Sequence, residues 1–515
     1  MTVELNRVLT SKGYAIKKTF LNEVQTSQLH SELTMAPKVL DKFQKVIPKF
    51  PVYYESKTRF YVPRHWGKQK FGEPEDDIVS FGVDLSNSIT FRNTFPPHDF
   101  QKEIITKFIE KGGNGLICVP CGYGKTFMAL NIAILLKKRF LIVVDKEFLM
   151  NQWKAEINNF IEGARVGILQ ANKIQTDVDK YDVTICMIQT ICRRDFPDNF
   201  FDEYGFTIFD ECHHLGASYF SQALRKIQTK YMLGLSATPD REDGLSRVFE
   251  YYLGEPVYKN TVREPDSEAV VKAVWFKSDN PVYSDIPVNW RGDPITAKLL
   301  NQLAEFEPRN IKIMTVLDEY IKDPNRYILL ISDRISQLEW FEKAFKELYP
   351  ACSVGYYIGG MKQRVLDENA DKCKVLLATY QMTAEGFSVK KLNTIVLTTP
   401  RKQVEQATGR IFRERITERK VAPHIIDIID SHNMLINRWM VRQRFYKKCK
   451  YVINHIDKTK KGNNTNVMNV MNVMNGMNII NKDEDNDDEK CDNEKYDNED
   501  NEDNEKKEDT FLFKF

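Results

Sequence analysis

Long apolar runs are missing from this sequence. No segment approaches the roughly 18–20 apolar residues that a membrane-spanning helix needs, and the opening MTVELNRVLT lacks the apolar core of a signal peptide. Cysteine is also sparse, with nine residues scattered through 515, mostly inside apolar segments. This pattern favours reduced, buried thiols over a disulfide framework. We therefore expect an intracellular protein of several domains, with no membrane partner.

Net charge is nearly absent as well, but the value of +2 conceals a division. Between Asp483 and Asp509, sixteen acidic residues stand against four basic ones, a balance of −12, so the rest of the chain carries +14. A basic body joined to an acidic tail suits a protein that binds a polyanion. Lysines spread over an ordinary solvated surface are the alternative explanation.

The end of the chain has little that could form a core. Residues 466–480 repeat every three residues, which fits neither a helix nor a strand, and the acidic run follows them. We expect 459–515 to be a disordered, low-complexity acidic tail. Its apolar end, TFLFKF, is either a solvated sticky end or a short docking peptide for a partner in the transcription machinery.

What the sequence does contain is a series of short apolar runs with helical patterns between them. Near-continuous apolar runs of this length are typical of parallel strands buried on both faces. The first series lies at 139–145, 182–188, 206–210 and 231–238, and the second at 327–333, 375–380, 394–399 and 424–430.

Two series predict an α/β protein with two tandem parallel-sheet domains. The first 90 residues differ, because the stretch FPVYYESKTRFYVPRHWG mixes aromatic, charged and proline residues, and they predict a small separate α/β domain. The expected divisions are an N-terminal domain at 1–90, a first lobe at 91–262, a second lobe at 263–458, and the tail.

The segment VPCGYGKT, residues 119–126, nearly spells a phosphate-binding loop. An apolar run precedes it and a helical pattern follows it, which is the context that such a loop requires. Val119 stands where the usual first glycine would be. Lys125 is expected to reach the β- and γ-phosphates of a nucleotide and Thr126 to bind Mg²⁺. The expected nucleotide-binding residues of this loop are Gly122, Tyr123, Gly124, Lys125 and Thr126.

Two carboxylates follow the apolar run FTIF, at the carboxyl end of a predicted strand, where α/β proteins bind ligands. Asp210 is expected to hold Mg²⁺ through water, and Glu211 to orient or deprotonate the attacking water. A solvated acidic turn is the alternative, which the strongly apolar strand before it disfavours.

The segment QATGRIFR predicts a helix with Gln406, Arg410 and Arg413 on one face. A glycine inside such a helix costs roughly 1 kcal/mol, so Gly409 argues for a close approach by another group rather than for an ordinary surface helix. Arginines from one domain that reach the γ-phosphate held by another would make hydrolysis depend on closure.

In this order, the motifs resemble those of the superfamily-two helicases and translocases. The set comprises PHDFQ (97–101), VPCGYGKT, VVDKEFLMNQW (143–153), DECH (210–213), SATP (236–239), ATYQMTAEGFS (378–388) and QATGRIFR. The triad Arg241–Glu242–Asp243 after SATP is similar to that of the xeroderma pigmentosum group B branch. PCGYGKT resembles the transcript-release helicases of large DNA viruses.

The resemblance implies two RecA-like domains that bind ATP and Mg²⁺ between them. Gln101 would recognise adenine, and Lys125, Asp210, Glu211, Gln406, Arg410 and Arg413 would be catalytic. Ser236 and Thr238, with the triad, would couple hydrolysis to the nucleic acid. Thr379, Glu385 and Gly386 would lie between nucleic acid and nucleotide, and residues 1–90 would match a small nucleic-acid-binding domain.

Three other patterns compete with these assignments. Cys118 and Cys121 have the spacing of half a zinc site, but no second pair follows. His213 is expected to bridge the carboxylates to the SAT segment, and His214 to be structural or exposed. In RQRFYKKCKY (442–451) the aromatic residues either line a nucleic-acid groove or close a core beneath solvated lysines.

We therefore expect an ATP-dependent DNA helicase or translocase that acts on duplex DNA or on DNA–RNA transcription complexes, without sequence preference. An RNA helicase is one alternative, and an ATP-gated clamp in a transcription complex is another. The expected location is the viral factory or virion for a viral protein and the nucleus otherwise.

Overall fold

The structure is a computed structural model. It describes residues 5–38, 49–92, 96–120, 122–241, 243–260, 265–384, 389–414 and 419–457. Four residues named above, Cys121, Glu242, Glu385 and Gly386, lie outside these ranges, as does the predicted tail.

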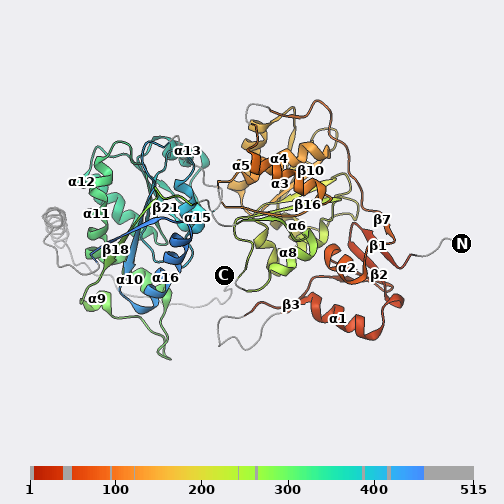
Figure 1. Ribbon diagram of the computed structural model, residues 1–515, viewed down its shortest axis with the longest axis horizontal. Helices are drawn as coiled ribbons and strands as arrows, with labels where there is room; N and C mark the ends of the chain where they lie inside the picture. The colour runs from red at the N-terminus through yellow and green to blue at the C-terminus, as the bar shows by residue number, and fades with distance from the viewer. Residues whose placement is uncertain are drawn as a thin grey trace, which may run out of the picture. The chain divides into compact units, whose positions relative to one another are not determined.

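The described residues up to Asp77 include a five-stranded sheet and two α-helices (Figure 1). The strand order is β5-β6-β2-β1-β7, antiparallel except for the pair β1–β7. Asn22 begins the first helix with a capping box that satisfies its N-terminal backbone donors. The elements are β1 (Arg7–Thr10), β2 (Gly13–Lys17), η1 (Lys18–Phe20), α1 (Glu23–Leu33), β3 (Thr34–Met35), β4 (Phe50–Pro51), β5 (Tyr54–Glu55), β6 (Arg59–Val62), α2 (Arg64–Phe71) and β7 (Asp76–Asp77).

The first lobe is an eight-stranded sheet in the order β13-β12-β14-β10-β15-β16-β9-β17. All neighbours are parallel except β12 and β13. Its strands are β9 (Asn114–Cys118), β10 (Phe140–Val144), β12 (Val166–Gln170), β13 (Lys173–Ile174), β14 (Val183–Met187), β15 (Phe206–Phe209), β16 (Tyr231–Ser236) and β17 (Pro256–Lys259); β8 (Thr90–Phe91) pairs separately with β11 (Ile161–Glu162).

Both faces of this sheet are covered, which is why its strands read as continuous apolar runs. Along β10, Phe140, Ile142 and Val144 enter one core, and Leu141 and Val143 enter the other. Figure 1 shows α3, α4 and α5 over the first face and α6 and α8 over the second. The helices are α3 (Asp99–Glu110), α4 (Lys125–Leu136), α5 (Glu147–Phe160), α6 (Ile188–Arg193), η2 (Cys212–Gly216), α7 (Ser221–Lys226) and α8 (Ser246–Leu253).

The N-terminal domain shares the core of the second face, through residues such as Tyr14 and Trp66. Arg64 holds this junction together because its buried guanidinium donates hydrogen bonds to the first lobe. All of the acceptors are neutral. These acceptors are Gln228 Oε1 at 3.1 Å, Thr229 O at 2.8 Å, and Asn114 Oδ1 and Lys230 O at 3.3 Å. Burial lowers the pKa of Arg64 to about 10.

The second lobe is a seven-stranded, wholly parallel sheet in the order β20-β21-β19-β22-β23-β18-β24. The strands are β18 (Val270–Phe276), β19 (Ile328–Ser332), β20 (Val354–Tyr357), β21 (Val375–Thr379), β22 (Thr394–Leu397), β23 (His424–Asp430) and β24 (Val452–Ile456). The helices are α9 (Pro281–Ser284), α10 (Thr296–Glu305), α11 (Glu307–Lys322), α12 (Ile335–Leu348), α13 (Gln363–Lys372), α14 (Tyr380–Ala384), α15 (Glu405–Thr408), η3 (Gly409–Ile411) and α16 (Asn433–Lys448).

These two parallel sheets confirm the predicted α/β architecture, and all eight apolar runs of the sequence are strands. The aromatic residues of 442–451 serve the core of the second lobe, since Tyr446 and Tyr451 are buried there while Lys447 and Lys448 are exposed. Among the residues that the structure describes, no helix combines the length and apolarity that a membrane span demands.

One predicted helix is wrong. The segment that carries Gln406, Arg410 and Arg413 is not a single helix, because α15 ends at Thr408 and a 3-10 turn follows. The Thr408 hydroxyl donates to Val404 O at 2.9 Å, a bond that bends helices, and Gly409 comes next. Phe412 then stacks on Tyr451 with ring centroids 5.3 Å apart, which draws the chain into the core.

Replacing Arg64 by alanine should destabilise the joined N-terminal domain and first lobe. The change leaves buried carbonyl and amide oxygens without donors, so we expect a loss of about 2–4 kcal/mol in the free energy of unfolding. Denaturant unfolding followed by circular dichroism measures it. Gln69→Ala, an exposed position on the same helix, is the control and should change stability by less than about 0.5 kcal/mol. Equal stability of R64A and Q69A would contradict the anchoring role.

Candidate active site

The phosphate-binding loop lies between β9 and α4, as the sequence predicts. Gly122 and Gly124 have φ of +91° and +78°, a left-handed conformation that side chains disfavour. Val119, in contrast, is buried in the core between the sheet and α4, and its N–H donates to Ser236 O at 3.2 Å. The valine at the first position of the loop is therefore a core residue. The glycines lie at the two positions where the backbone has a left-handed conformation.

Gln101 holds the loop from α3. Its side chain donates from Nε2 to Tyr123 O at 3.1 Å and accepts at Oε1 from the N–H of His98 at 3.0 Å. A Cβ on Gly124 would lie 2.5 Å from Gln101 Nε2, so Gly124 is also required by this contact. The structure thus places Gln101 against the phosphate loop, and its recognition of adenine stays a prediction.

Asp210 and Glu211 follow β15 at the carboxyl edge of the sheet. Lys125 Nζ lies 3.4 Å from Glu211 Oε1, and Trp153 donates its indole N–H to Asp210 Oδ2 at 2.8 Å. Desolvation, followed by the like charge of Glu211, raises the pKa of Asp210 well above its usual range, and Lys125 opposes this rise. A carboxylate pair in such surroundings is stabilised in its ionised form by a cation, which fits Mg²⁺ held by Asp210 and Thr126.

His213 connects the carboxylates to the SAT segment. Its Nδ1 lies 3.0 Å from Ser236 Oγ and 3.4 Å from Glu211 Oε2. Ser236 Oγ in turn accepts from the N–H of Thr238 at 3.1 Å. The predicted bridge is confirmed. One third of the His214 side chain is exposed, and its Nε2 lies 3.8 Å from Asp145 Oδ2.

Arg241 ties the residues after SAT to the same segment. Its guanidinium pairs with both carboxylate oxygens of Asp243, Nε to Oδ1 at 2.9 Å, and donates to His213 O. A Cβ on Gly216 would lie 2.8 Å from Arg241 Cδ, so the arginine packs closely on the turn that begins with Cys212. Arg241 and Asp243 therefore brace the backbone of His213.

Arg410 belongs to a separate group in the second lobe. It is buried, and its Nε donates to Thr383 O at 2.7 Å. The Thr383 hydroxyl donates to Tyr380 O at 3.1 Å and Thr379 O at 3.3 Å. The helix α14 thus joins two predicted site residues, Arg410 and Thr379. Gln406, on α15, and Arg413, beyond η3, are half-buried.

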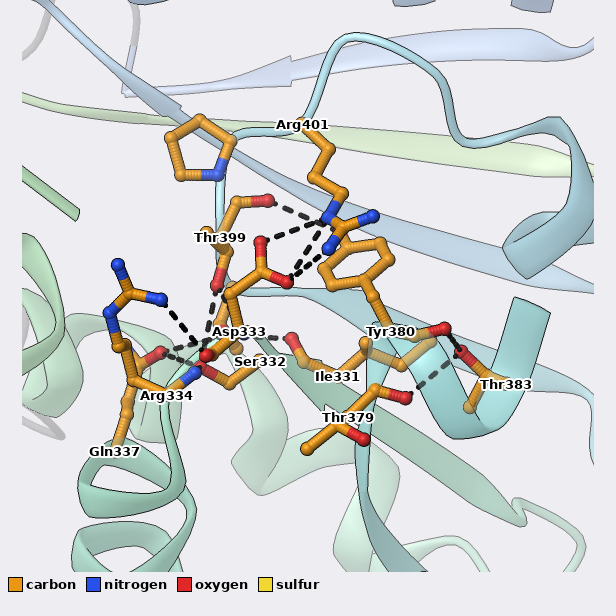
Figure 2. A network of polar contacts seen from close by, with 12 residues as sticks. Ile331, Ser332, Asp333, Arg334, Gln337, Thr379, Tyr380, Thr383, Thr399 and Arg401 are labelled. Atoms are coloured by element: carbon orange, nitrogen blue, oxygen red, sulfur yellow. Dashed lines mark hydrogen bonds and ion pairs between the residues drawn. The ribbon is translucent and has the colours of Figure 1, made fainter. Parts of the chain in front are cut away.

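The polar network continues across the carboxyl edge of the second sheet (Figure 2). Tyr380 donates its hydroxyl to Thr399 O at 3.1 Å, and the Asp333 N–H donates to Thr399 Oγ1 at 2.9 Å. Arg401 pairs with Asp333 and lies 4.6 Å from the centre of the Tyr380 ring. Thr379 is therefore held inside a connected set of hydrogen bonds.

Three of these residues were missed by sequence reasoning. Trp153 stands in a quoted motif, but nothing in its spacing shows that it contacts Asp210. Thr383 and Arg401 act through backbone carbonyls and an ion pair, which leave no pattern in the sequence. Of the two cysteines with zinc-like spacing, Cys118 is buried on β9, and burial raises the pKa of its thiol to about 12.

Two parallel-sheet lobes, with a phosphate loop and paired carboxylates in the first, define a motor ATPase, and comparisons identify its family. Residues 94–241 match the family described as "Type III restriction enzyme, res subunit". The chain is 31% identical over 463 residues to a protein of Acanthamoeba polyphaga mimivirus provisionally named an ATP-dependent RNA helicase, covering 88% of this chain and 87% of that one.

The chain therefore belongs to the superfamily-two helicases, which hydrolyse ATP and bind nucleic acid, and it is of the type found in large DNA viruses. A protein of African swine fever virus, also provisionally named an ATP-dependent RNA helicase, is 28% identical over 384 residues, or 70% of this chain and 74% of the relative. A DNA 3'-5' translocase of Sulfurisphaera tokodaii is 28% identical over 205 residues, or 40% and 45%.

Replacing Trp153 by phenylalanine should slow ATP turnover and leave the fold intact. The ring still fills the core, but Asp210 loses its indole donor, so the carboxylate is less well oriented. Removal of such a supporting contact costs roughly 10- to 100-fold in activity at metal sites. Steady-state ATPase assays measure the loss, with Trp340→Phe, half-buried on α12, as the control. Parental turnover in W153F would contradict the role given to Trp153.

Replacing Gly124 by alanine should impair nucleotide binding. The added Cβ meets Gln101, and φ of +78° is costly for alanine, so the loop must shift. We expect the dissociation constant for a fluorescent ATP analogue to rise about tenfold or more. Ala129→Gly, at a buried position of α4, is a control for helix stability alone. Unchanged affinity in G124A would show that the loop does not depend on this contact.

Proposed function

We propose that this chain is an ATP-driven motor that tracks duplex DNA, alone or within DNA–RNA transcription complexes. The observation that carries the proposal is the brace between Arg241, Asp243 and the backbone of His213. It connects the residues after SAT, which resemble those of the xeroderma pigmentosum group B branch, to the turn that follows the carboxylates of the ATP site. The DNA translocase of Sulfurisphaera tokodaii supports DNA as the substrate.

In this proposal, the first lobe binds the nucleotide. Lys125 holds the β- and γ-phosphates, Thr126 and Asp210 hold Mg²⁺, and Glu211 orients the attacking water. Bound Mg²⁺ would neutralise charge that develops on the phosphate oxygens. Lys125 Nζ lies 3.4 Å from Glu211 Oε1. The lysine proposed to bind the phosphates therefore lies beside the carboxylate proposed to orient the water.

The second lobe would supply Arg410 to the γ-phosphate. Its Nε donates to Thr383 O at 2.7 Å, which orients the guanidinium, and a guanidinium binds phosphate oxygens through charge-assisted hydrogen bonds. Because Thr383 also bonds the backbone of Thr379, movement of Arg410 toward a phosphate is transmitted to a residue expected to contact nucleic acid. This connection would couple hydrolysis to a change in the grip of the second lobe.

An RNA helicase is the second candidate, and the names of the mimivirus and African swine fever virus relatives favour it. ATPase stimulation by duplex DNA, single-stranded DNA and structured RNA at equal nucleotide concentration separates the two. We expect duplex DNA to stimulate most, with displacement of a third strand from a triplex as the sign of tracking. Strongest stimulation by RNA, without triplex displacement, would overturn the proposal in favour of the RNA helicase.

Two substitutions test the site itself. Lys125→Ala should abolish hydrolysis because the phosphate cation is lost. Arg410→Ala should keep ATP binding and lower turnover by about 10³-fold or more, since it removes charge stabilisation in the transition state. Arg364→Ala, on the exposed surface of α13, is the control. Parental ATPase rates in R410A would show that the second lobe does not complete the site.

Backbone contacts should dominate nucleic-acid binding, so affinity should fall steeply with salt and vary little with sequence. Raising the salt concentration from 50 to 200 mM should weaken duplex binding by about 10³-fold if six phosphates are contacted. Fluorescence anisotropy with two scrambled duplexes of equal length measures both effects. Affinities that differ between the two sequences by more than about tenfold would contradict sequence-independent tracking.

A further inference from the structure

A hairpin in the second lobe presents an exposed tryptophan. It runs from Ile286 to Ile295, between α9 and α10, and an antiparallel bridge pairs Val288 with Pro294. Trp290, near its tip, is 85% exposed, the highest value for a large apolar side chain among the residues that the structure describes. Ile286 and Val288 on the same hairpin are exposed as well, so the hairpin presents apolar surface of the kind that marks a binding site.

The turn that carries Trp290 is held rigidly. Asn289 Oδ1 accepts from the N–H of Arg291 at 2.9 Å and of Asp293 at 3.0 Å. The Asn289 N–H donates to Asp293 O, and the Gly292 N–H donates to Asn289 O, both at 2.9 Å. Gly292 has φ of +83°, which the turn needs and most residues resist. The position of the indole is therefore specified by the sequence around it.

Arg291 adds a charge to the aromatic surface. Its guanidinium carbon lies 4.2 Å from the centre of the Trp290 ring, so the two flat groups are close enough for a cation–π contact. An indole beside a guanidinium offers a planar, positively charged surface. Nucleobases stack on surfaces of this kind whatever their identity, and the nearby phosphates favour the positive charge.

The base of the hairpin is fixed to the carboxyl edge of the second sheet. Gln302 Nε2 donates to Asp285 O at 2.9 Å, and the Tyr283 hydroxyl bonds Asp430, at the end of β23, at 3.2 Å. Arg334, just after β19, donates to Ala297 O of α10 at 3.1 Å. Thr379, at the end of β21, lies at this same edge. The hairpin therefore rises from the edge where the second lobe is expected to meet nucleic acid.

We propose that Trp290, supported by Arg291, stacks on an unpaired base of a nucleic-acid strand that lies along the carboxyl edge of the second lobe. This inference rests on the proposed nucleic-acid motor and adds a preference for single-stranded regions. The stacking surface recognises a base by its flat face, so the contact is independent of sequence and of the sugar. A docking surface for a protein is the competing use of the same residues.

The test compares single-strand and blunt-duplex binding by the full chain. Trp290→Ala should weaken binding of a fluorescent single-stranded oligonucleotide by about tenfold, and leave blunt-duplex affinity and basal ATPase within about twofold. Arg291→Ala should weaken single-strand binding by a smaller factor. Val288→Ala, on the same hairpin, removes exposed apolar surface without a ring and is the matched control. Thermal unfolding checks that each variant is folded.

A local signal makes the result specific. Binding of the oligonucleotide should quench tryptophan fluorescence in the parent, and Trp290→Phe should lose that quenching and keep part of the affinity. Single-strand binding by W290A equal to that of the parent overturns the proposal and leaves the protein-docking use. If no nucleic acid stimulates the parental ATPase, the proposed motor fails; the quenching measurement, which needs no hydrolysis, still decides whether Trp290 contacts a base.

Discussion

Two adjacent carboxylates at the end of one apolar strand constrain the arrangement of the groups around them in the first lobe. Removing Asp210 and Glu211 from water is costly, and their mutual repulsion adds to that cost. Three neighbouring groups offset this cost: the Lys125 ammonium of the phosphate loop, the Trp153 indole N–H of α5 and the His213 imidazole of the next turn. Those groups come from separate elements, so the carboxylate pair determines how the loop, α5 and the SAT segment are arranged.

The second lobe has the same kind of parallel sheet, but its charged residues are arranged differently. Among the described residues at its carboxyl edge, Asp333 is paired with Arg401. Arg410 is buried and donates from Nε to the backbone carbonyl of Thr383 at 2.7 Å. The first lobe thus gathers two carboxylates beside its phosphate loop, and the second lobe buries an arginine against α14.

Much of this architecture could be predicted because burial on both faces leaves a clear trace. β10 is apolar at every position and β23 contains two isoleucine pairs, so their runs stand out. The edge strand β24 was not predicted, since its residues are mostly exposed or half-buried and read as an ordinary polar segment. The break after Thr408 was also missed, because it depends on Phe412 stacking against Tyr451, a contact between residues 39 positions apart that no local pattern records. Similarly, the motifs located Asp210 and Arg410, but their partners Trp153 and Thr383 are brought near by the fold alone.

The Arg64 junction has a consequence for how the molecule responds to its ionic surroundings. Its guanidinium donates to neutral amide and carbonyl oxygens, and the bonds to Gln228 and Thr229 are buried, so dissolved ions have little to screen there. The ion pairs at the same boundary, such as Lys12 with Asp198, are exposed and contribute little at any salt concentration. The N-terminal domain should thus remain bound to the first lobe at salt concentrations that dissociate a polyanion from the protein. Salt can then release a nucleic acid without separating these two domains.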